Sequence, residues 1–255
     1  MNDFIRKETY KNWWKENNKP IASGQLHDHH TGISTLNKKR YILTSAQNNT
    51  FAHDEFLQSL ETMANHINAQ IIVGTFSYNK TGFQNLEKGD KEWFDPKLTS
   101  YILDEPVRLA NGLIWCGELN ILPTATNPLS GLYSYTKNDS GIIPHAKVQL
   151  ESLPTHKFEP TRMLYTTGAV TKRNYIQKKA GQKASFHHIF GALLVEIDDD
   201  GEWFVRQLIA NSETGEFFDL DTLYTPKGIF KSRYVEAINW GDIHVEKLDE
   251  DAANA

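Results

Sequence analysis

The sequence predicts an α/β protein with a mixed β-sheet, in which an early parallel βαβ unit and a later antiparallel hairpin are flanked by helices. The βαβ unit is predicted by a short apolar run at 40–44, by helical spacing of apolar residues over 53–68, and by a second apolar run at 70–76. Two buried strands joined by an amphipathic helix are typical of a parallel sheet. The hairpin is predicted by two strand-like runs, 190–197 and 202–208, that flank the turn sequence Asp-Asp-Asp-Gly.

The other elements follow from local composition. Residues 1–19 predict a short polar helix that ends before Pro20, because the residue before a proline is disfavoured in the helical region. Further strands are expected at 113–117, 147–150, 162–167 and 234–240, and polar or glycine- and proline-rich loops at 77–100, 120–144 and 168–185. These elements suggest an N-terminal helix with a histidine-rich loop (1–35) and an α/β domain (36–240).

Composition narrows the class of protein. The 255 residues are 39% hydrophobic and 23% charged, as is ordinary for a globular protein, and the formal net charge is −5. The single cysteine, Cys116, excludes a disulfide within the chain and is expected to be a small core residue. No apolar run approaches the length of a membrane span, and the first residues lack the apolar core of a signal peptide.

The sequence Gly-Asp-Ile-His at 241–244 follows the predicted strand 234–240. Residues two apart on a strand share a face, so Asp242 and His244 would present an oxygen and a nitrogen ligand side by side. Such a pair suits Mn, Fe or Zn, and two metals held close together are a common device for hydrolysing phosphodiesters. The alternative is a carboxylate that caps a turn beside an exposed histidine.

Two other groups of potential ligands are weaker candidates. His27, Asp28, His29 and His30 are consecutive, so they point in alternating directions and rarely supply more than two ligands to one metal. Asp219 and Asp221 would share a face of an extended segment. A solvated loop is the favoured interpretation of the first group, and a turn rich in hydrogen bonds is favoured for the second.

A polar loop is expected directly after the first parallel strand. In open α/β sheets ligands bind beyond the carboxyl ends of the strands, and the N-terminus of a helix favours anions. Thr50 is a candidate N-cap of the following helix. The amide and hydroxyl groups of this loop are therefore candidates to bind a phosphate or a nucleotide, the alternative being a simple capped turn. The residues concerned are Ser45, Gln47, Asn48, Asn49 and Thr50.

A basic segment is the candidate DNA-binding element. Between Glu159 and Glu196 the chain has no acidic residue, although the protein is acidic overall. Cations interleaved with an aromatic and an amide side chain suit phosphate contacts and base stacking, although a basic run is often only a solvated surface. The candidate residues are Lys172, Arg173, Asn174, Tyr175, Lys178, Lys179 and Lys183. His187 and His188 follow, and we expect one to face inward and the other to face the loop.

Several of these segments occur together in a known family. The segments 41–50, 123–132, 166–169, 186–192, 219–224 and 241–244 resemble, in this order, the pre-early DNA-transfer proteins of tequintavirus-type bacteriophages, which have a calcineurin-like metallophosphoesterase domain. The resemblance implies that residues 241–255 begin that domain, with Asp242 and His244 as the first two ligands of a two-metal centre. The later Gly-Asn-His motif of the family does not occur in this sequence, so this chain is expected to hold only part of such a centre.

The resemblance implies a metal-dependent DNA phosphodiesterase that acts during phage takeover of host DNA in the cytoplasm of the infected bacterium. The implied cofactor is a divalent metal, Mn in the first instance. The implied partners are DNA and, as a further candidate, a second early phage protein, and a homo-oligomer is expected. Two alternatives stay open: a non-catalytic DNA-binding or oligomerisation module, and a nucleotide-binding regulatory domain that uses the 45–50 loop.

Overall fold

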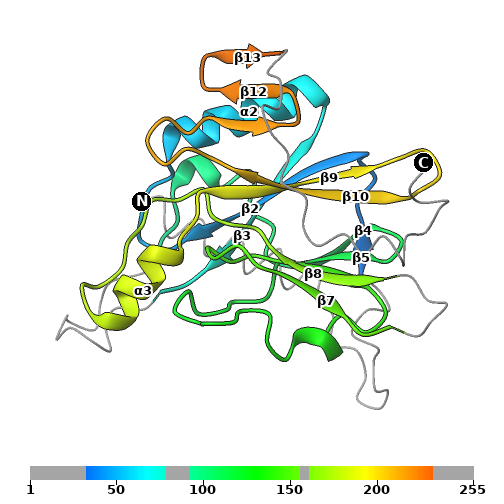
Figure 1. Cartoon of the computed structure of the whole chain (residues 1–255), viewed down its shortest axis with the longest axis horizontal. Coiled ribbons are helices and arrows are strands. Elements are labelled where there is room, and N and C mark those ends of the chain that lie inside the picture. Colours follow the sequence, from blue (N-terminus) through cyan, green and yellow to red (C-terminus); the bar gives the residue numbers. More distant parts are fainter. Residues whose placement is uncertain (1–32, 79–91, 156–160, 232–255) are drawn as a thin grey trace, which may run out of the picture. The chain divides into compact units, whose positions relative to one another are not determined.

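The fold is known from a computed structural model that describes residues 33–78, 92–155 and 161–231. In these ranges the chain forms three β-sheets with two α-helices and two short 3-10 helices (Figure 1). The predicted α/β class is confirmed, and parallel and antiparallel pairs occur together in two of the sheets. The predicted helix of residues 1–19 and the predicted strand 234–240 lie outside the described residues.

The central sheet has four strands in the order β10-β9-β2-β3. Its parallel half is the predicted βαβ unit, formed by β2 (Arg40–Gln47), α2 (Asp54–Ile67) and β3 (Gln70–Phe76). Its other half is the predicted hairpin of β9 (Gly191–Ile197) and β10 (Trp203–Ile209). Because β9 pairs antiparallel with β2, the two units that the sequence predicted separately form one sheet.

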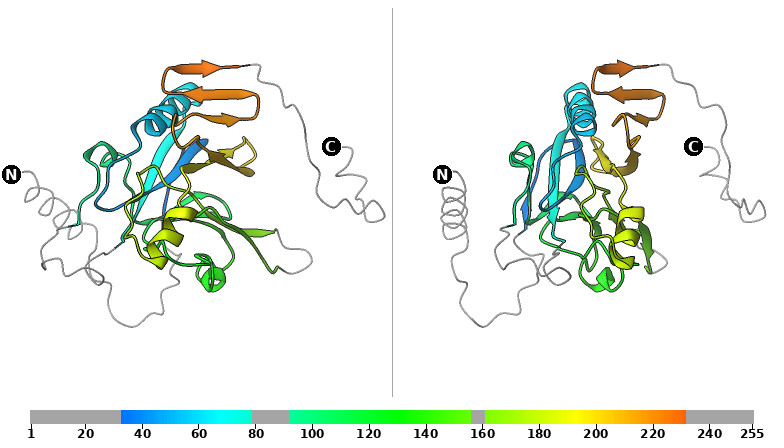
Figure 2. Two further views of the ribbon diagram at one scale, coloured as in Figure 1. Left: turned by 60° about the vertical axis from the view of Figure 1, so that its left-hand side comes forward. Right: turned by 90° about the vertical axis from the view of Figure 1, so that its left-hand side faces the viewer.

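Both faces of β2 are buried, which explains its nearly continuous apolar sequence. Ile42 points toward the cluster that contains α2, whereas Tyr41 and Leu43 point toward Trp115 in another sheet. The alternation follows from the period of two residues in a strand. The four-stranded sheet is therefore the middle layer of the fold (Figure 2).

On one side of this layer lie α2 and a sheet that the sequence analysis missed, with the strands β11 (Phe217–Asp219), β12 (Thr222–Thr225) and β13 (Gly228–Phe230). Phe217 and Tyr224 pack on α2, where Phe56 meets Phe217 edge to face at 5.9 Å. Strands of three or four residues leave too short a pattern to be recognised from sequence.

On the other side lies a six-stranded sheet in the order β1-β4-β5-β6-β8-β7. Its strands are β1 (Ser34–Thr35), β4 (Pro106–Ala110), β5 (Leu113–Cys116), β6 (Ser140–Ile143), β7 (Leu150–Leu153) and β8 (Arg162–Thr166). The 3-10 helices η1 (Pro96–Leu98) and η2 (Leu132–Ser134) lie in the connections before β4 and before β6. Trp115 of β5 packs between this sheet and β2, and Cys116 is buried as expected.

Several predicted boundaries were wrong. The turn expected at 45–50 begins later, because β2 continues to Gln47. The predicted loop 120–144 contains η2 and β6, and the strand predicted at 147–150 is β7, which begins at Leu150. The predicted loop 168–185 contains most of α3 (Lys179–His187). No helix in the described part of the chain is long and apolar enough to cross a membrane.

Candidate nucleic-acid interface

The crevice at the carboxyl end of β2, where a ligand was expected, is filled by the chain itself. Residues 168–175 cross this end of the strand, and the Ser45 hydroxyl donates a hydrogen bond of 2.6 Å to the Gly168 carbonyl. The Gln47 amide donates to the Thr171 hydroxyl at 2.8 Å. The polar groups of β2 therefore bind a neighbouring segment of the protein in the place where a ligand would lie.

The asparagines of the 45–50 loop are also engaged inside the protein. The Asn48 side chain accepts from the Tyr78 amide at 2.8 Å, and the Asn49 side chain accepts from the Trp93 amide at 3.0 Å. The Asn174 side chain donates to the Asn49 carbonyl at 2.6 Å. The backbone amides of Asn48 and Asn49, which a phosphate would need as donors, donate to the Phe76 and Trp93 carbonyls at 3.1 and 2.8 Å. These donors are therefore engaged inside the protein, which argues against an open phosphate-binding loop.

The cap of α2 differs from the prediction as well. Thr50 is not the N-cap; His53 is, and its Nδ1 accepts from the Phe56 amide at 3.3 Å. The other ring nitrogen of His53 donates to the Ser212 carbonyl at 3.0 Å, so both nitrogens are used. The hypothesis of a nucleotide site formed by Ser45, Gln47, Asn48, Asn49 and Thr50 therefore loses most of its donors.

The basic segment lies on the outside of this filled crevice. Lys172, Arg173, Lys178, Lys179 and Lys183 are exposed, whereas Asn174 is half-buried and Tyr175 is buried. Helix α3 packs on the end of β3 through Ala184, which belongs to a small cluster with Tyr78, Tyr175 and Ile176 (Figure 1). The predicted cations are therefore accessible, and the predicted stacking residue is not.

Tyr175 and His188 anchor this segment from inside. His188 donates from Nε2 to the Thr171 carbonyl at 2.8 Å, so its Nδ1 is the acceptor for the Tyr175 hydroxyl at 2.7 Å. Burial lowers the pKa of His188 to about 3, so the ring is neutral. His188 is thus the inward-facing member of the histidine pair, and Tyr175 is a structural residue that cannot stack on a base.

Two ammonium groups converge on one residue of the η2 connection. Lys183 of α3 donates from Nζ to the Thr126 hydroxyl at 2.8 Å, and Lys147 donates from Nζ to the Thr126 carbonyl. Within the described ranges neither lysine forms an ion pair. Partial burial, together with repulsion from Lys147 and Lys183, lowers the pKa of the neighbouring His187. Positive charge is concentrated here without a carboxylate to neutralise it, which is the arrangement that a phosphate requires.

The exposed face of α3 continues this positive surface. Lys179, Lys183 and Phe186 are four and then three residues apart, so they lie along one side of the helix. The first turn of α3 contains no acidic residue and begins at Lys178. Lysines at a helix N-terminus add to the positive end of the helix dipole, which also attracts anions.

Residues predicted to hold a metal are not brought together in the described part of the chain. Asp242, His244 and the histidines at 27, 29 and 30 lie outside it. Within it, no group of three His, Cys, Asp or Glu side chains could hold a metal ion. Asp219 accepts two hydrogen bonds from Arg206, at 2.7 and 2.9 Å, which agrees with the interpretation of that segment as a bonded turn.

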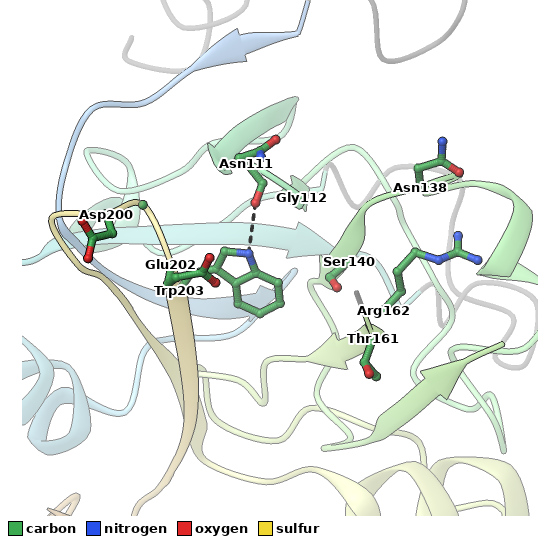
Figure 3. Close-up of a pocket in the computed structure, with 10 residues that line it drawn as sticks. Asn111, Gly112, Asn138, Ser140, Thr161, Arg162, Asp200, Glu202 and Trp203 are labelled. Atoms are coloured by element: carbon green, nitrogen blue, oxygen red, sulfur yellow. Dashed lines mark hydrogen bonds between the residues drawn. The ribbon is translucent and has the colours of Figure 1, made fainter. Parts of the chain in front are cut away.

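A separate pocket of about 430 Å³ lies between the β9–β10 turn and the six-stranded sheet. Figure 3 shows the Trp203 indole between the acidic side chains of Asp200 and Glu202 and the group formed by Ser140, Thr161 and Arg162. The indole N–H donates to the Asn111 carbonyl at 3.0 Å, which fixes the ring as one wall. The sequence analysis missed this pocket, because its lining residues come from four separate segments of the chain.

Comparison with known proteins shows that the chain is similar to a bacteriophage protein. The chain is 46% identical over 246 residues to Protein A1 of Escherichia phage T5, and the match covers 94% of this chain and 44% of that protein. The chain therefore spans less than half the length of the curated relative it matches. No family model and no solved structure matches the chain.

Proposed function

We propose that the described domain binds DNA through the basic surface, defined as the exposed or half-exposed cations of α3 and its surroundings: Lys147, Lys172, Arg173, Lys178, Lys179 and Lys183. The observation that carries the proposal is the meeting of Lys147 and Lys183 at Thr126, where neither lysine is paired with a carboxylate of the described residues. Neutralising phosphates and releasing their counterions would supply the free energy of binding. The family resemblance supports DNA as the ligand.

The positive charge of the basic surface contrasts with the net negative charge of the chain. The formal net charge of the chain is −5, so the protein as a whole repels DNA at long range. Between residues 160 and 195 there are six Lys or Arg residues and no acidic residue. A phosphate chain would therefore be drawn to one side of the domain.

For the complete protein we propose a metal-dependent DNA phosphodiesterase that acts on host DNA in the infected bacterium. The support is the family resemblance and the Gly-Asp-Ile-His sequence that contains Asp242 and His244. In this proposal the domain described here holds the substrate, and a divalent metal, Mn in the first instance, acts elsewhere in the protein. A homo-oligomer and a second early phage protein as a partner belong to the same proposal.

The binding proposal is tested by fluorescence anisotropy with labelled DNA over a range of salt concentrations. The double variant Lys179→Met, Lys183→Met should reduce the slope of log affinity against log salt by roughly 1–2, because each lost phosphate contact changes it by about 0.9 for duplex DNA. The matched control is Lys227→Met, Lys231→Met, which removes two exposed lysines that flank β13 of the three-stranded sheet. Equal binding by wild type and both variants would contradict the proposal.

The phosphodiesterase proposal needs a separate test in the natural full-length protein. Manganese-dependent release of nucleotides from DNA should be lost in Asp242→Asn and in His244→Asn, while DNA affinity without metal is retained. Hydrolysis that is unchanged in both variants would exclude these residues as metal ligands. If the protein binds DNA but shows no hydrolysis with Mn²⁺, the non-catalytic binding module becomes the better description.

A further inference from the structure

The basic surface is bordered by aromatic side chains that have no role in the core. Phe186 of α3 is 80% exposed, and its only ring partner in the described residues is the neighbouring His187. Exposure of a large apolar ring to solvent has a cost in free energy, and on α3 this ring lies along the same side as the exposed cations Lys179 and Lys183. What distinguishes Phe186 from the other exposed apolar side chains is its position beside the cations of α3, where a ligand that contacts them would also cover the ring.

A second aromatic group lies where the basic segment meets the start of α2. Phe51 is 62% exposed and Trp93 is 38% exposed, and their ring centroids are 5.0 Å apart with the planes tilted by 55°. The Lys172 amide donates to the Phe51 carbonyl at 2.9 Å, so a cation of the basic surface is adjacent to this pair. The Trp93 amide is bonded to the Asn49 side chain, which holds the backbone of the pair in place.

Arg173 connects the two aromatic groups. It follows Lys172 in the chain, and its guanidinium donates to the His188 carbonyl at the end of α3, at 3.1 and 3.3 Å. The same guanidinium lies 5.3 Å from the centre of the Phe190 ring. The backbone that carries the Phe51–Trp93 pair is thus tied, through Lys172 and Arg173, to the end of the helix that carries Phe186.

We infer that the DNA bound here is single-stranded, with bases stacked on Phe186 and on the Phe51–Trp93 pair while the cations between them contact the backbone. This inference rests on the proposed DNA binding. In a duplex the faces of the bases are already covered by their neighbours, so exposed aromatic rings gain little from it. In a single strand every base offers a free face, and stacking on aromatic side chains is the usual means of binding without sequence preference.

The test compares a labelled single strand with a duplex of the same sequence at one salt concentration. Phe186→Ala and Phe51→Ala should each weaken single-strand binding by about 5- to 100-fold, which is the effect of losing one stacked base, and should leave duplex binding nearly unchanged. The control is Phe218→Ala, which removes a phenylalanine of similar exposure, 55%, from the three-stranded sheet. Phe186→Tyr keeps the aromatic ring and should retain affinity.

The outcomes separate this inference from the proposal on which it rests. If Lys179→Met, Lys183→Met weakens binding of both DNAs and the alanine variants bind the single strand like wild type, single-strand stacking is wrong and DNA binding stands. If the alanine variants weaken both DNAs equally, the aromatic side chains contact the backbone and the inference also fails. If the lysine variant binds both DNAs like wild type, the two proposals fail together.

Discussion

The hydroxyl of Tyr175 provides the sharpest test of how the basic segment is held. Tyr175→Phe removes only the donor to His188 Nδ1 and keeps the buried ring, which is 7% exposed. Because His188 already uses Nε2 to donate to the Thr171 carbonyl, its neutral ring cannot change tautomer without losing that bond. The substitution therefore leaves Nδ1 as a buried acceptor without a donor.

The expected loss follows from this geometry. A buried polar group left without its partner costs about 1–3 kcal/mol. With a urea dependence of about 2 kcal/mol per molar, the midpoint of unfolding should fall by roughly 0.5–1.5 M. The assay is urea unfolding followed by circular dichroism. The control is Tyr165→Phe, since the half-buried Tyr165 hydroxyl has no hydrogen-bond partner within the described residues and its removal should change stability little.

The reasoning would be refuted if Tyr175→Phe were as stable as the wild type or no less stable than Tyr165→Phe. A change in the dependence of the unfolding free energy on urea concentration would be a different result, because it would indicate that the folded or the unfolded state had become more or less compact. Tyr175→Phe should also leave the DNA affinity of the folded protein unchanged, because the ring is inside the domain.

Three further outcomes are expected. The pKa of His188 is lowered to about 3 in the folded protein, whereas in the unfolded chain it is about 6.5. Above pH 6.5 the neutral ring therefore costs the folded state nothing. As the pH falls below 6.5 the unfolded chain gains a proton that the folded protein does not, and the free energy of unfolding falls by about 1.4 kcal/mol per pH unit. Urea unfolding at successive pH values should show a smaller slope in His188→Gln than in the wild type. Part of the slope should remain, because burial also lowers the pKa of His145. Gly168→Ala should destabilise the protein by more than Gly201→Ala. Both glycines have positive φ, so alanine costs about 1–2 kcal/mol at either position. Only at position 168 would the new Cβ also lie 2.8 Å from the backbone of β9. Lys183→Met should raise the pKa of His187, measured by NMR titration, because it removes one of the charges that lower it; an unchanged pKa would contradict the convergence of charge at Thr126.

The elements that could be predicted from the sequence are those with long, regular patterns. The βαβ unit and the β9–β10 hairpin extend over enough residues for the periods of strand and helix to be distinguished. Strand β4 was missed because it begins with Pro106. A proline is tolerated at the first position of a strand, but in a sequence it usually indicates that no strand is present. Helix α3 was missed because its nine residues contain Gly181 and few apolar positions.

The candidate site was predictable in its charge and not in its geometry. The run without acidic residues identified five cations that the structure exposes, since exposure is the ordinary state of a lysine. Sequence alone could not show that Tyr175 turns inward while Phe186 turns outward, because the direction of an aromatic side chain depends on packing from other elements. Lys147 was missed for a similar reason: it is distant in sequence and meets Lys183 only through Thr126.

The filled crevice and the basic surface have one physical cause. Within residues 168–175 the buried positions bind the end of β2, as Thr171 does through its hydroxyl. The next residue, Lys172, is exposed, and the exposed Arg173 is held by its guanidinium against the His188 carbonyl. A segment fixed in this way presents its cations in nearly one arrangement, so a ligand would order fewer side chains on binding. In the proposed function, the ligand therefore binds on the outer side of the segment that fills the crevice, and not in the crevice where an open α/β sheet usually binds it. This is why variants that loosen the inner contacts should affect stability first, whereas variants of the outer side chains should affect DNA affinity alone.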